Sequence, residues 1–418
     1  MFLSFYHFIW SFLGAVFFGF PSRFRRGFGG QASKIFVLGV TGTKGKSTVL
    51  ELINAILEAA GKKTALLSSI RIKIGEENRK NYSGNTMPGR AFVQRFLRQA
   101  VEAGCDYAFV EVTSQGVLQH RHRFIKWDAA LFTNLAPEHI EAHGGFENYR
   151  AAKVSFFKYA RNIKGSRLFF INQDDPNAQY FIEAAQKGKV ILYSQNTLNS
   201  KFYIPNSNLI GDFNRENIVA AIVFAKSRGI DEEIIKKAIE NFPGVPGRME
   251  IIQEKPFKVI IDYAHTPDSL EKVYQTLRRQ LVNSSVHKLI CVLGGAGGGR
   301  DKWKRPKMGE IAANYCDEII LTNEDPYNEE PLGIINDIEE GVRVNPRFDP
   351  RKSAAVYKLI DRREAIKKAI FLAKEGDAVI ITGKGCEPWL HLEKGKKIPW
   401  DERKITEEIL LEKASRKH

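Results

Sequence analysis

A glycine-rich turn between an apolar run and an amphipathic segment constrains the fold of this chain most strongly. The run 35–40 is typical of a buried strand, and apolar residues recur at helical spacing from Ser47 onward. The turn between them is Gly42-Thr-Lys-Gly-Lys-Ser47. Such a loop at a helix N-terminus cradles phosphate groups, because backbone N–H groups and the helix dipole face the anion. The sequence therefore predicts a nucleoside triphosphate site in an α/β domain.

Within this loop, we expect Lys46 to reach the terminal phosphates and the Ser47 hydroxyl to hold Mg2+. The loop is shorter than the common G-x-x-x-x-G-K-[ST] pattern, because Val40 stands where that pattern has its first glycine. The alternative interpretation is a lysine-rich surface turn. It is disfavoured because strand, glycine pair, Lys-Ser pair and helix follow one another in the required order.

Strand and helix patterns alternate in two series along the chain. Predicted strands of the first series cover 35–40, 107–112, 129–133, 168–172 and 190–193, and a predicted helix covers 214–228. Turn residues cluster at 241–247 and indicate a boundary. Predicted strands of the second series cover 258–262, 288–293, 318–322 and 377–382, with a helix at 362–374. This alternation predicts mostly parallel sheets with helices on both faces.

The predicted organisation therefore has three parts. We expect a hydrophobic segment over residues 1–30, a central P-loop domain over 31–244, and a C-terminal Rossmann-like α/β domain over 245–418. In parallel sheets of this kind, ligands bind at the carboxyl ends of the strands.

The first 22 residues differ from the remainder, because none of them is charged and Arg23, Arg25 and Arg26 follow directly. About 20 apolar residues can span a bilayer, and a basic flank on the C-terminal side would keep the rest of the chain in the cytoplasm. A cleaved signal peptide is disfavoured, since the positive charges come after the apolar run. We expect a membrane span or a surface anchor; the alternative is a packed or amphipathic helix.

Charge and cysteine content narrow the class of protein. The net charge of +15 favours an anionic partner, which could be a nucleotide, a nucleic acid or a membrane surface. Nucleic acid is disfavoured because there is no dense Lys/Arg run and no aromatic–basic RNA motif. The 4 cysteines are scattered without a C-x-x-C pair, which argues against a zinc site or a disulfide framework and fits a reducing cytosol.

Three further residues suit phosphoryl chemistry. Glu111 ends an apolar strand, where a carboxylate can hold Mg2+. His139 follows another predicted strand, near the expected phosphate site. Lys153 lies among the apolar positions of a helix, where burial would lower its pKa and make its amine reactive. From spacing alone, a solvated surface position remains the alternative for each.

The order of several separated motifs resembles the Mur ligases, the ATP-dependent amide ligases of peptidoglycan precursor synthesis. The resemblance covers about residues 31–418 and is strongest to the branch that acts on UDP-N-acetylmuramoyl-L-alanyl-D-glutamate and adds the third peptide residue. The motifs, in addition to the loop 42–47, are Asn85-Thr86-Met-Pro88, Glu111-Val-Thr-Ser-Gln-Gly116, Gln119-His-Arg121, Ala151-Ala-Lys153, Gly211-Asp-Phe-Asn214, Gly247-Arg-Met-Glu250, Asp262-Tyr-Ala-His-Thr-Pro-Asp268, Gly299-Arg-Asp-Lys302 and Gly383-Lys-Gly-Cys-Glu387.

The resemblance implies a role for each matching residue. The ATP-binding set would be Gly42, Thr43, Lys44, Gly45, Lys46, Ser47, Asn214, Asn217, Arg248 and Asp262. The Mg2+ ligands would be Ser47, Glu111, His139 and Lys153 as a carbamate. The muramoyl-dipeptide would contact Asn85, Thr86, Thr113, Gln119 and Arg121, and the incoming amino acid would contact Arg300, Asp325, Gly383 and Glu387. The catalytic set would be Lys46, Glu111, His139, Lys153 and Arg248.

The implied reaction is an attack of a substrate carboxylate on the γ-phosphate of ATP, followed by attack of an amine on the acyl phosphate. The partners are then ATP, an amino acid and a muramoyl-peptide precursor, and the enzyme would be a cytoplasmic monomer. From the apolar residues 1–22 we expect attachment to the cytoplasmic face of the membrane. A P-loop kinase or nucleotide switch, and a membrane-tethered scaffold without activity, are the alternatives.

Three departures from the family pattern qualify this implication. The N-terminal domain that grips the UDP group in the family is missing, which allows a lipid-linked carboxylate substrate as an alternative. The amino-acid selectivity loop is Glu324-Asp-Pro-Tyr327, where the diaminopimelate-adding type has Asp-Asn-Pro-Arg. Gln115 and Cys386 each replace a histidine of a family motif.

Overall fold

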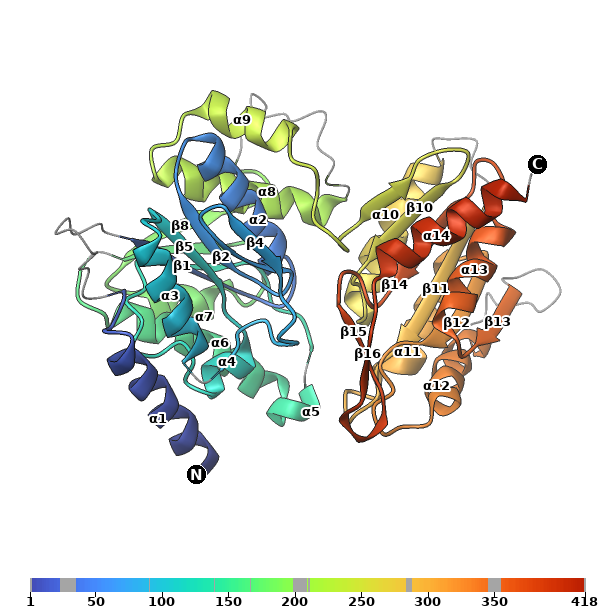
Figure 1. The fold of residues 1–418 in the computed structure, drawn as a ribbon, viewed down its shortest axis with the longest axis horizontal. Helices are drawn as coiled ribbons and strands as arrows, with labels where there is room; N and C mark the ends of the chain where they lie inside the picture. Colours follow the sequence, from blue (N-terminus) through green and yellow to red (C-terminus); the bar gives the residue numbers. More distant parts are fainter. Residues whose placement is uncertain are drawn as a thin grey trace. The chain divides into compact units, whose positions relative to one another are not determined.

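The computed structural model describes residues 2–22, 35–89, 91–138, 140–165, 167–197, 209, 211–282, 288–344 and 355–416. The chain divides into two compact units (Figure 1). The first consists mainly of residues 1–137, 143–208 and 212–243, and the second mainly of residues 244–418. Each unit is built around one mostly parallel sheet.

The sheet of the first unit has the strand order β4-β3-β2-β5-β1-β6-β7-β8. Strands β2, β5, β1, β6, β7 and β8 are parallel, and the β3–β4 hairpin is added antiparallel to β2. The bounds are β1 (Phe36–Thr41), β2 (Thr64–Leu67), β3 (Arg71–Ile74), β4 (Glu77–Lys80), β5 (Tyr107–Glu111), β6 (Ala129–Phe132), β7 (Leu168–Asn172) and β8 (Lys189–Tyr193).

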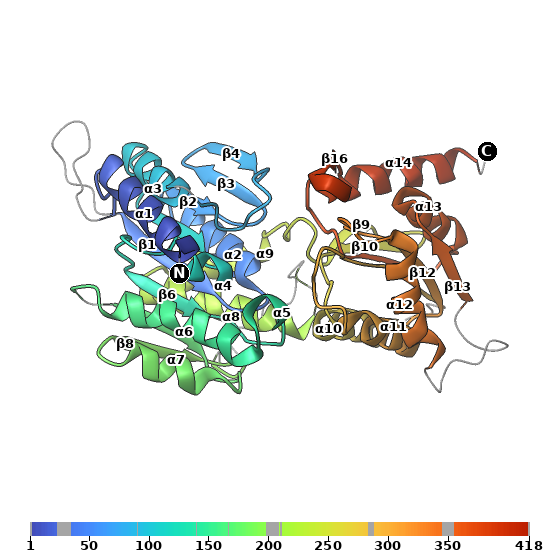
Figure 2. The same ribbon diagram turned by 90° about the horizontal axis from the view of Figure 1, so that it is seen from below.

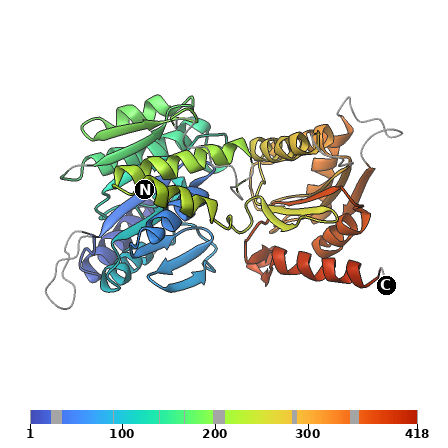
Figure 3. The same cartoon turned by 90° about the horizontal axis from the view of Figure 1, so that it is seen from above.

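Helices cover both faces of this sheet. Side chains of α3, α6 and α7 pack with one face of β1, β5, β6 and β7 in a single apolar core. On the other face, Phe224 of α8 contacts the rings of Phe109 and Phe170, and α2 and α9 pack beside α8, which is yellow-green in Figure 3. The bounds of the helices in this unit are α2 (Lys46–Ala59), α3 (Phe92–Glu102), α4 (Ser114–Leu118), α6 (Phe146–Arg161), α7 (Ala178–Ala185), α8 (Asp212–Ser227) and α9 (Glu232–Glu240). The short helix α5 (Ile140–His143) belongs mostly to the second unit.

The sheet of the second unit has the order β13-β12-β11-β14-β10-β9, in which β9 alone of these strands is antiparallel to its neighbour. Helices α13 and α14 form an apolar core with one face of this sheet. Helices α10, α11 and α12 pack together on the other face of the sheet. The strands are β9 (Glu250–Gln253), β10 (Lys258–Asp262), β11 (Leu289–Gly295), β12 (Glu318–Asn323), β13 (Ala355–Leu359) and β14 (Ala378–Thr382), and a small hairpin consists of β15 (Trp389–His391) and β16 (Lys397–Pro399). The helices are α10 (Pro267–Val282), α11 (Lys304–Tyr315), α12 (Pro331–Arg343), α13 (Arg362–Leu372), the 3-10 turn η2 (Glu393–Gly395) and α14 (Glu402–Ser415).

The mostly parallel α/β fold predicted from the sequence is confirmed for both units, and the glycine loop lies in the first. The predicted strands are present, and their ends agree with the prediction to within two residues. The prediction missed β2, β3, β4, β9, β13 and the β15–β16 hairpin.

The amino-terminal segment forms the helix α1 (Phe2–Phe17), which lies beside α3 (Figures 1 and 2). Gly14 faces Ala91 so closely that an added Cβ would lie 2.2 Å from the Ala91 Cβ. Of the helices that the structure describes, none combines the length and apolarity needed to cross a membrane. The expected membrane span is therefore not supported, because the apolar stretch forms a helix of only 16 residues that packs along one side.

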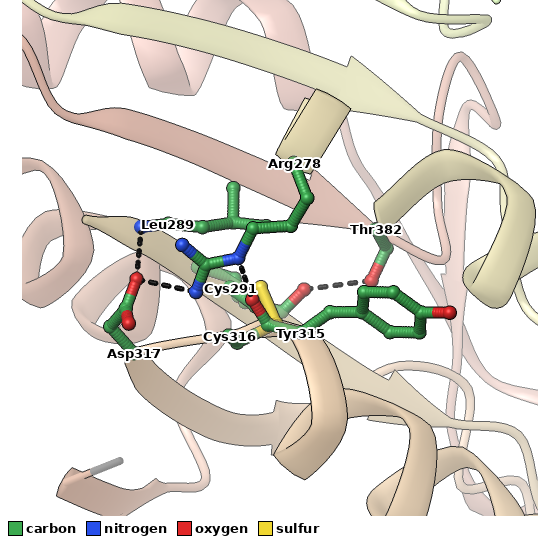
Figure 4. The surroundings of a disulfide bond; sticks show 8 residues. Arg278, Leu289, Cys291, Tyr315, Cys316, Asp317 and Thr382 are labelled. Atoms are coloured by element: carbon green, nitrogen blue, oxygen red, sulfur yellow. Dashed lines mark hydrogen bonds and ion pairs between the residues drawn. A yellow bond between two sulfur atoms is a disulfide. The ribbon is translucent and has the colours of Figure 1, made fainter. Parts of the chain in front are cut away.

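Two of the cysteines form a disulfide, which corrects the expectation that none is paired. Cys291 belongs to β11 and Cys316 directly precedes β12 (Figure 4), with the Cα atoms 6.1 Å apart. Beside the disulfide, Asp317 accepts hydrogen bonds from Arg278 (2.6 Å) and from the Leu289 backbone N–H (2.7 Å). The register pairs Cys291 with Ile319, so Cys316 reaches Cys291 from the segment just before β12, and no local cysteine spacing reveals this contact.

Candidate functional site

The glycine loop connects the carboxyl end of β1 to the start of α2. Gly45 occupies the N-cap of α2 in the left-handed region, with φ of 82°, where a residue with a Cβ would be strained. Asn217 of α8 lies directly against it, because an added Cβ at Gly45 would be 2.2 Å from the Asn217 Oδ1. The N-terminus of α2, with its first backbone N–H groups, is therefore bordered by Gly45 and by the amide side chain of Asn217.

Two lysines converge on one backbone oxygen of this loop. The Nζ atoms of Lys46 and Lys153 both donate to the Gly42 carbonyl, at 3.1 and 2.7 Å. Lys46 also donates to the Thr43 carbonyl at 2.8 Å, and Lys153 lies 4.7 Å from the centre of the Tyr149 ring. Because Lys153 is almost fully buried in α6, two cationic groups meet where the sequence predicts phosphates.

Glu111 supplies the negative charge of the site. It is buried at the end of β5 and its Oε2 accepts hydrogen bonds from the Ser47 hydroxyl and the Ser69 backbone N–H, both at 2.9 Å. The Lys46 Nζ lies 3.9 Å from the other carboxylate oxygen. The structure thus brings together Lys46, Ser47, Glu111 and Lys153, as the sequence predicts, and adds Ser69, whose hydroxyl lies 3.0 Å from that of Ser47.

The donor set suits Mg2+. The Ser47 hydroxyl and the Glu111 carboxylate, which lie 2.9 Å apart, can both supply oxygen ligands to a metal ion. Mg2+ is usually held by one or two carboxylates together with substrate phosphates and waters. Lys153 fits this set only as a carbamate, because an ammonium has no lone pair. Within the described residues, no group of three His, Cys, Asp or Glu side chains could hold a metal ion by itself. His139 lies outside the described residues.

The glycine loop is also held by residues that follow β6 and by a residue of α6, none of which was predicted from the sequence as part of the site. The Asn134 carbonyl accepts from the Thr43 N–H at 2.8 Å, and its Oδ1 accepts from the Lys44 N–H at 2.9 Å. The Thr43 hydroxyl is 3.0 Å from the Tyr149 hydroxyl, and Thr133 donates to the Lys44 carbonyl at 2.7 Å. In these bonds Lys44 is held through its backbone, and Thr43 is held through both its backbone N–H and its hydroxyl.

The two asparagines of α8 are paired. The Asn217 Nδ2 donates to the Asn214 Oδ1 at 3.1 Å, and both side chains are buried. This bond orients the Asn217 Oδ1 toward Gly45, so Asn217 borders the phosphate loop, whereas Asn214 supports it.

A second group in the first unit contains the residues expected to contact the carboxylate substrate. Arg121 donates to the Gln119 side chain and to the Met87 carbonyl, which links the 119–126 loop to the segment that carries Asn85 and Thr86. Burial lowers the pKa of Arg121. Thr113 is the N-cap of α4 and accepts from the Gly116 N–H at 3.0 Å. The structure brings Gln119 and Arg121 together, while the Asn85 side chain bonds only locally to the Ser83 carbonyl at 3.4 Å in the hydrogen bonds described.

In the second unit, Asp262 ends β10 and organises the backbone around it. Its two oxygens accept from the Met249 and Ala264 N–H groups, each at 2.7 Å. Arg248 precedes Met249 and lies with its guanidinium 4.1 Å from the centre of the Tyr263 ring. Asp262 thus places Arg248 and Tyr263 side by side at the carboxyl end of β10.

Three of the four residues expected at the amino acid subsite lie around Lys384. The Lys384 Nζ contacts both Asp325 oxygens at 3.0 Å and the Glu387 Oε2 at 2.7 Å. The Glu387 Oε1 accepts from the Tyr263 hydroxyl at 2.6 Å. Gly383, next to Lys384, lies against Glu324, because an added Cβ there would be 2.6 Å from the Glu324 Oε2.

The charges in this cluster are strongly coupled. Burial opposes the ammonium of Lys384, but Glu387, Asp325 and Glu324 outweigh it and raise the Lys384 pKa. Burial also opposes ionisation of Glu387, but Lys384 and the Tyr263 hydrogen bond outweigh it and lower the Glu387 pKa. Burial raises the pKa of Glu324, and among the described residues its Oε2 has no hydrogen-bond partner.

Arg300 lies apart from the Lys384 contacts, in a stack with Tyr327. Its Nη2 donates to the Tyr327 hydroxyl at 2.8 Å and its guanidinium lies 4.5 Å from the ring centre. The Tyr327 ring in turn stacks on His391, with centroids 5.1 Å apart. Tyr327 therefore contacts both Arg300 and His391 and helps to hold Arg300 in place.

The residues missed from the sequence are Ser69, Asn134, Tyr149, Tyr263, Glu324 and Lys384. Two signals could have found some of them. Asn134 directly follows a predicted strand at the ligand-binding edge, and Lys384 lies inside the Gly-Lys-Gly motif. Ser69 and Tyr149 had no such signal, because their contacts depend on packing between distant segments.

Comparison with known proteins gives a consistent result. The model of the Mur ligase middle domain matches residues 40–206, and that of the Mur ligase glutamate ligase domain matches residues 247–385. The UDP-N-acetylmuramoyl-L-alanyl-D-glutamate–2,6-diaminopimelate ligase of Syntrophomonas wolfei is 38% identical over 92% of this chain and 80% of its own length. The ligase of the same name from Aquifex aeolicus is also 38% identical, over 92% and 79%. A solved structure of a ligase with this name matches with a TM-score of 0.58 at 28% identity, over 91% of this chain and 79% of that chain.

Proposed function

The chain belongs to the Mur ligase family of ATP-dependent, ADP-forming ligases, and from this premise we propose that it adds one amino acid to a muramoyl-dipeptide precursor of peptidoglycan. The observation that carries the proposal is the convergence of Lys46, Ser47, Glu111 and Lys153 at the glycine loop. This arrangement combines cationic groups for phosphates with oxygen donors for Mg2+.

The first step is attack of the muramoyl-dipeptide carboxylate on the γ-phosphorus of ATP, which forms an acyl phosphate and releases ADP. Two anions must approach each other, so Lys46 stabilises the charge that develops on the transferred phosphoryl group. Ser47 and Glu111 would hold Mg2+, which would supply positive charge to neutralise the phosphate groups. Arg248 serves the phosphates and Asp262 the ribose, as the family resemblance implies.

The second step is attack of the amino acid nitrogen on the acyl phosphate carbonyl. The C–N bond forms, inorganic phosphate leaves, and the nitrogen loses a proton. The unpaired Glu324 Oε2, next to Gly383, supports a place for the incoming amine in the second unit. Arg300, Asp325, Gly383 and Glu387 then position the amino acid, and Asn85, Thr86, Thr113, Gln119 and Arg121 hold the muramoyl-dipeptide.

Lys153 acts in this proposal as a carbamate. Two ammonium groups on one carbonyl repel each other, which favours loss of a proton from Lys153. Addition of CO2 to the neutral amine, with release of a second proton to solvent, would form an N–C bond and an anionic carbamate that would join Ser47 and Glu111 as a ligand of Mg2+. We place this chemistry in a central domain of residues 31–244 and a C-terminal domain of residues 245–418. The proposed enzyme is a monomer that works in the cytoplasm.

The decisive experiment measures ATP-dependent phosphate release and amide formation together. UDP-linked muramoyl-dipeptide is supplied with each amino acid of a panel that includes diaminopimelate and lysine. The proposal expects phosphate release and amide product in equal amounts with at least one amino acid. Phosphate transfer that needs no amine would indicate a kinase or nucleotide switch instead, and would refute the ligase.

A further inference from the structure

The amino-terminal helix α1 is held against the first unit along one side. Its Phe8 ring contacts His120 and Phe124, with centroids 5.8 and 5.3 Å away, and the Ser4 hydroxyl lies 2.9 Å from the His120 Nε2. Phe12 also contacts Phe124, at 5.4 Å. These contacts fix the rotation of α1 about its axis, so they also fix which side chains it presents outward.

The outward side of α1 is a continuous apolar surface. Phe17 is 83% exposed and Phe5 is 64% exposed, and their neighbours along the helix are exposed as well. We call this the α1 face, and it comprises Phe5, Tyr6, Trp10, Leu13, Val16 and Phe17. Large exposed apolar patches on soluble units mark interaction sites. A mixture of aliphatic residues with tyrosine and tryptophan is typical of helices at a membrane–water interface.

The length of the helix limits how it can meet a membrane. A helix of 16 residues is about 24 Å long, which is less than the thickness of about 30 Å of a bilayer core. The same helix is also tied along its inner side to α3 and to the 119–126 loop. It can therefore lie along a membrane surface but cannot cross it.

The charges around α1 favour anionic lipid. No residue from 1 to 22 is charged, whereas α3 and the 119–126 loop carry five Lys and Arg residues and one acidic residue, Glu102. Glu102 is already paired with Arg98 at 2.7 Å. In the sequence, Arg23, Arg25 and Arg26 follow the segment. An apolar face on an uncharged helix that packs against elements with an excess of cations complements negatively charged headgroups.

The same helix reaches the residues proposed for the carboxylate substrate. His120, which bonds Ser4, lies between Gln119 and Arg121, and Ser11 of α1 lines a small pocket with Gly89 and Arg121. The α1 face and the muramoyl-dipeptide residues therefore belong to one packed part of the first unit.

We propose that α1 docks the enzyme on anionic membrane surfaces and presents the Gln119–Arg121 region to a muramoyl peptide carried by a membrane lipid. The second half of this proposal depends on the ligase function proposed above, whereas the docking does not. The occupant of the α1 face is the lipid surface itself. A second copy of this chain and a separate protein are the outcomes that would contradict it.

The docking test uses the full chain, without ATP or substrate. Binding is measured by sedimentation with vesicles of phosphatidylcholine alone and with about one third phosphatidylglycerol, at low and high salt. The variant Phe5→Glu/Phe17→Glu places two acids on the α1 face. Its matched control is Val344→Glu/Leu411→Glu, which makes the same charge change at positions that are each 71% exposed in the second unit.

We expect the native chain to bind the anionic vesicles, the α1 variant to lose at least tenfold in affinity, and the control to bind as the native chain does. Thermal unfolding of both variants should match the native chain, because the substituted side chains are exposed. Equal vesicle binding by the α1 variant would overturn the proposal. Absence of vesicle binding by the native chain would also overturn it. A native dimer that the α1 variant dissociates in ultracentrifugation would then assign the α1 face to a second copy of this chain, and a native monomer would leave it without either occupant.

The substrate test compares a muramoyl-dipeptide tethered to phosphatidylethanolamine in the anionic vesicles with a soluble muramoyl-dipeptide. We expect the α1 variant to ligate the tethered substrate at least tenfold more slowly than the native chain, and the soluble one at the same rate. If the α1 variant and the native chain ligate the tethered substrate at equal rates, as well as the soluble one, lipid presentation is refuted. Vesicle binding without ligation of either substrate would refute the ligase function and leave the docking in place.

Discussion

Replacing Glu111 by glutamine separates a catalytic role of this carboxylate from a structural one. Glutamine has the same shape, so its Oε1 can still accept from the Ser47 hydroxyl and the Ser69 N–H, which now reach Oε2 at 2.9 Å. What the substitution removes is the negative charge near Lys46, 3.9 Å away, and the oxygen that we assign to Mg2+. The fold should therefore keep its bonds while the site loses its charge.

The expected magnitudes differ for stability and for activity. Two hydrogen bonds that change from charged to neutral acceptors lose about 1 kcal/mol each. The smaller cost of burying an amide offsets part of this loss, so the free energy of unfolding should fall by about 2 kcal/mol at most. Loss of one group that stabilises transition-state charge costs about 10²- to 10³-fold in rate, which corresponds to about 3–4 kcal/mol in activation free energy.

The assay pairs phosphate release with urea unfolding, and Asp128→Asn is the matched control. Asp128 is also a buried carboxylate of the first sheet: it accepts from the Val37 N–H at 3.0 Å and lies 3.8 Å from Arg167. It lies at the amino end of β6, at the edge of the sheet opposite to the glycine loop. We expect similar small losses of stability in both variants, and loss of turnover only in Glu111→Gln. More than a tenth of native turnover in that variant would refute the role of Glu111.

Three further predictions concern lysines. Lys46→Ala should abolish phosphate release with an unchanged unfolding midpoint; undiminished release would exclude its role at the phosphates. Lys153→Ala should lose activity and regain part of it with added acetate, and removal of dissolved CO2 should inactivate the native enzyme reversibly; an active enzyme without CO2 would exclude the carbamate. Lys384→Met leaves Asp325 and Glu387 without their cation, and should lower the unfolding free energy by about 3 kcal/mol near neutral pH. Because the Glu387 pKa is lowered from its usual 4.5 and the Lys384 pKa is raised from its usual 10.5, the stabilising contribution is complete between these values. It should disappear as the pH falls through the lowered Glu387 value or rises through the raised Lys384 value, so a pH-independent difference in urea unfolding would contradict this reasoning.

The central strands could be predicted from the sequence because they are buried on both faces and therefore consist of continuous apolar residues. The strand β10, Lys258–Asp262, was predicted with both ends correct. The edge strands β4 and β13 could not be found in this way. The residues of β4, Glu-Asn-Arg-Lys, are mostly exposed, and an edge strand is commonly polar because only one side pairs with a neighbour. Its position depends on pairing with β3, not on its own pattern.

The residues of the site also fall into a group that could be predicted from the sequence and a group that could not. Residues at strand ends or in glycine motifs, such as Ser47 and Glu111, could be predicted because chain position alone brings them to the ligand-binding edge. Residues that support the site through tertiary contacts could not, as Ser69 and Tyr149 show. The Cys291–Cys316 disulfide belongs to this second class, since a tertiary contact brings together two cysteines that are 25 residues apart in the sequence.

The glycine loop itself explains why this part of the chain was the most predictable. Gly42 offers one carbonyl to two ammonium groups, at 3.1 and 2.7 Å, while the nearest carboxylate oxygen of Glu111 is 3.9 Å from Lys46. Two like charges at one acceptor are costly unless an anion compensates them. In the proposed enzyme Lys153 is a carbamate, which relieves this cost, so Lys46 and the N–H groups at the start of α2 supply the positive charge that a bound triphosphate requires. This requirement stays visible in the sequence as the Gly45-Lys-Ser47 end of the loop.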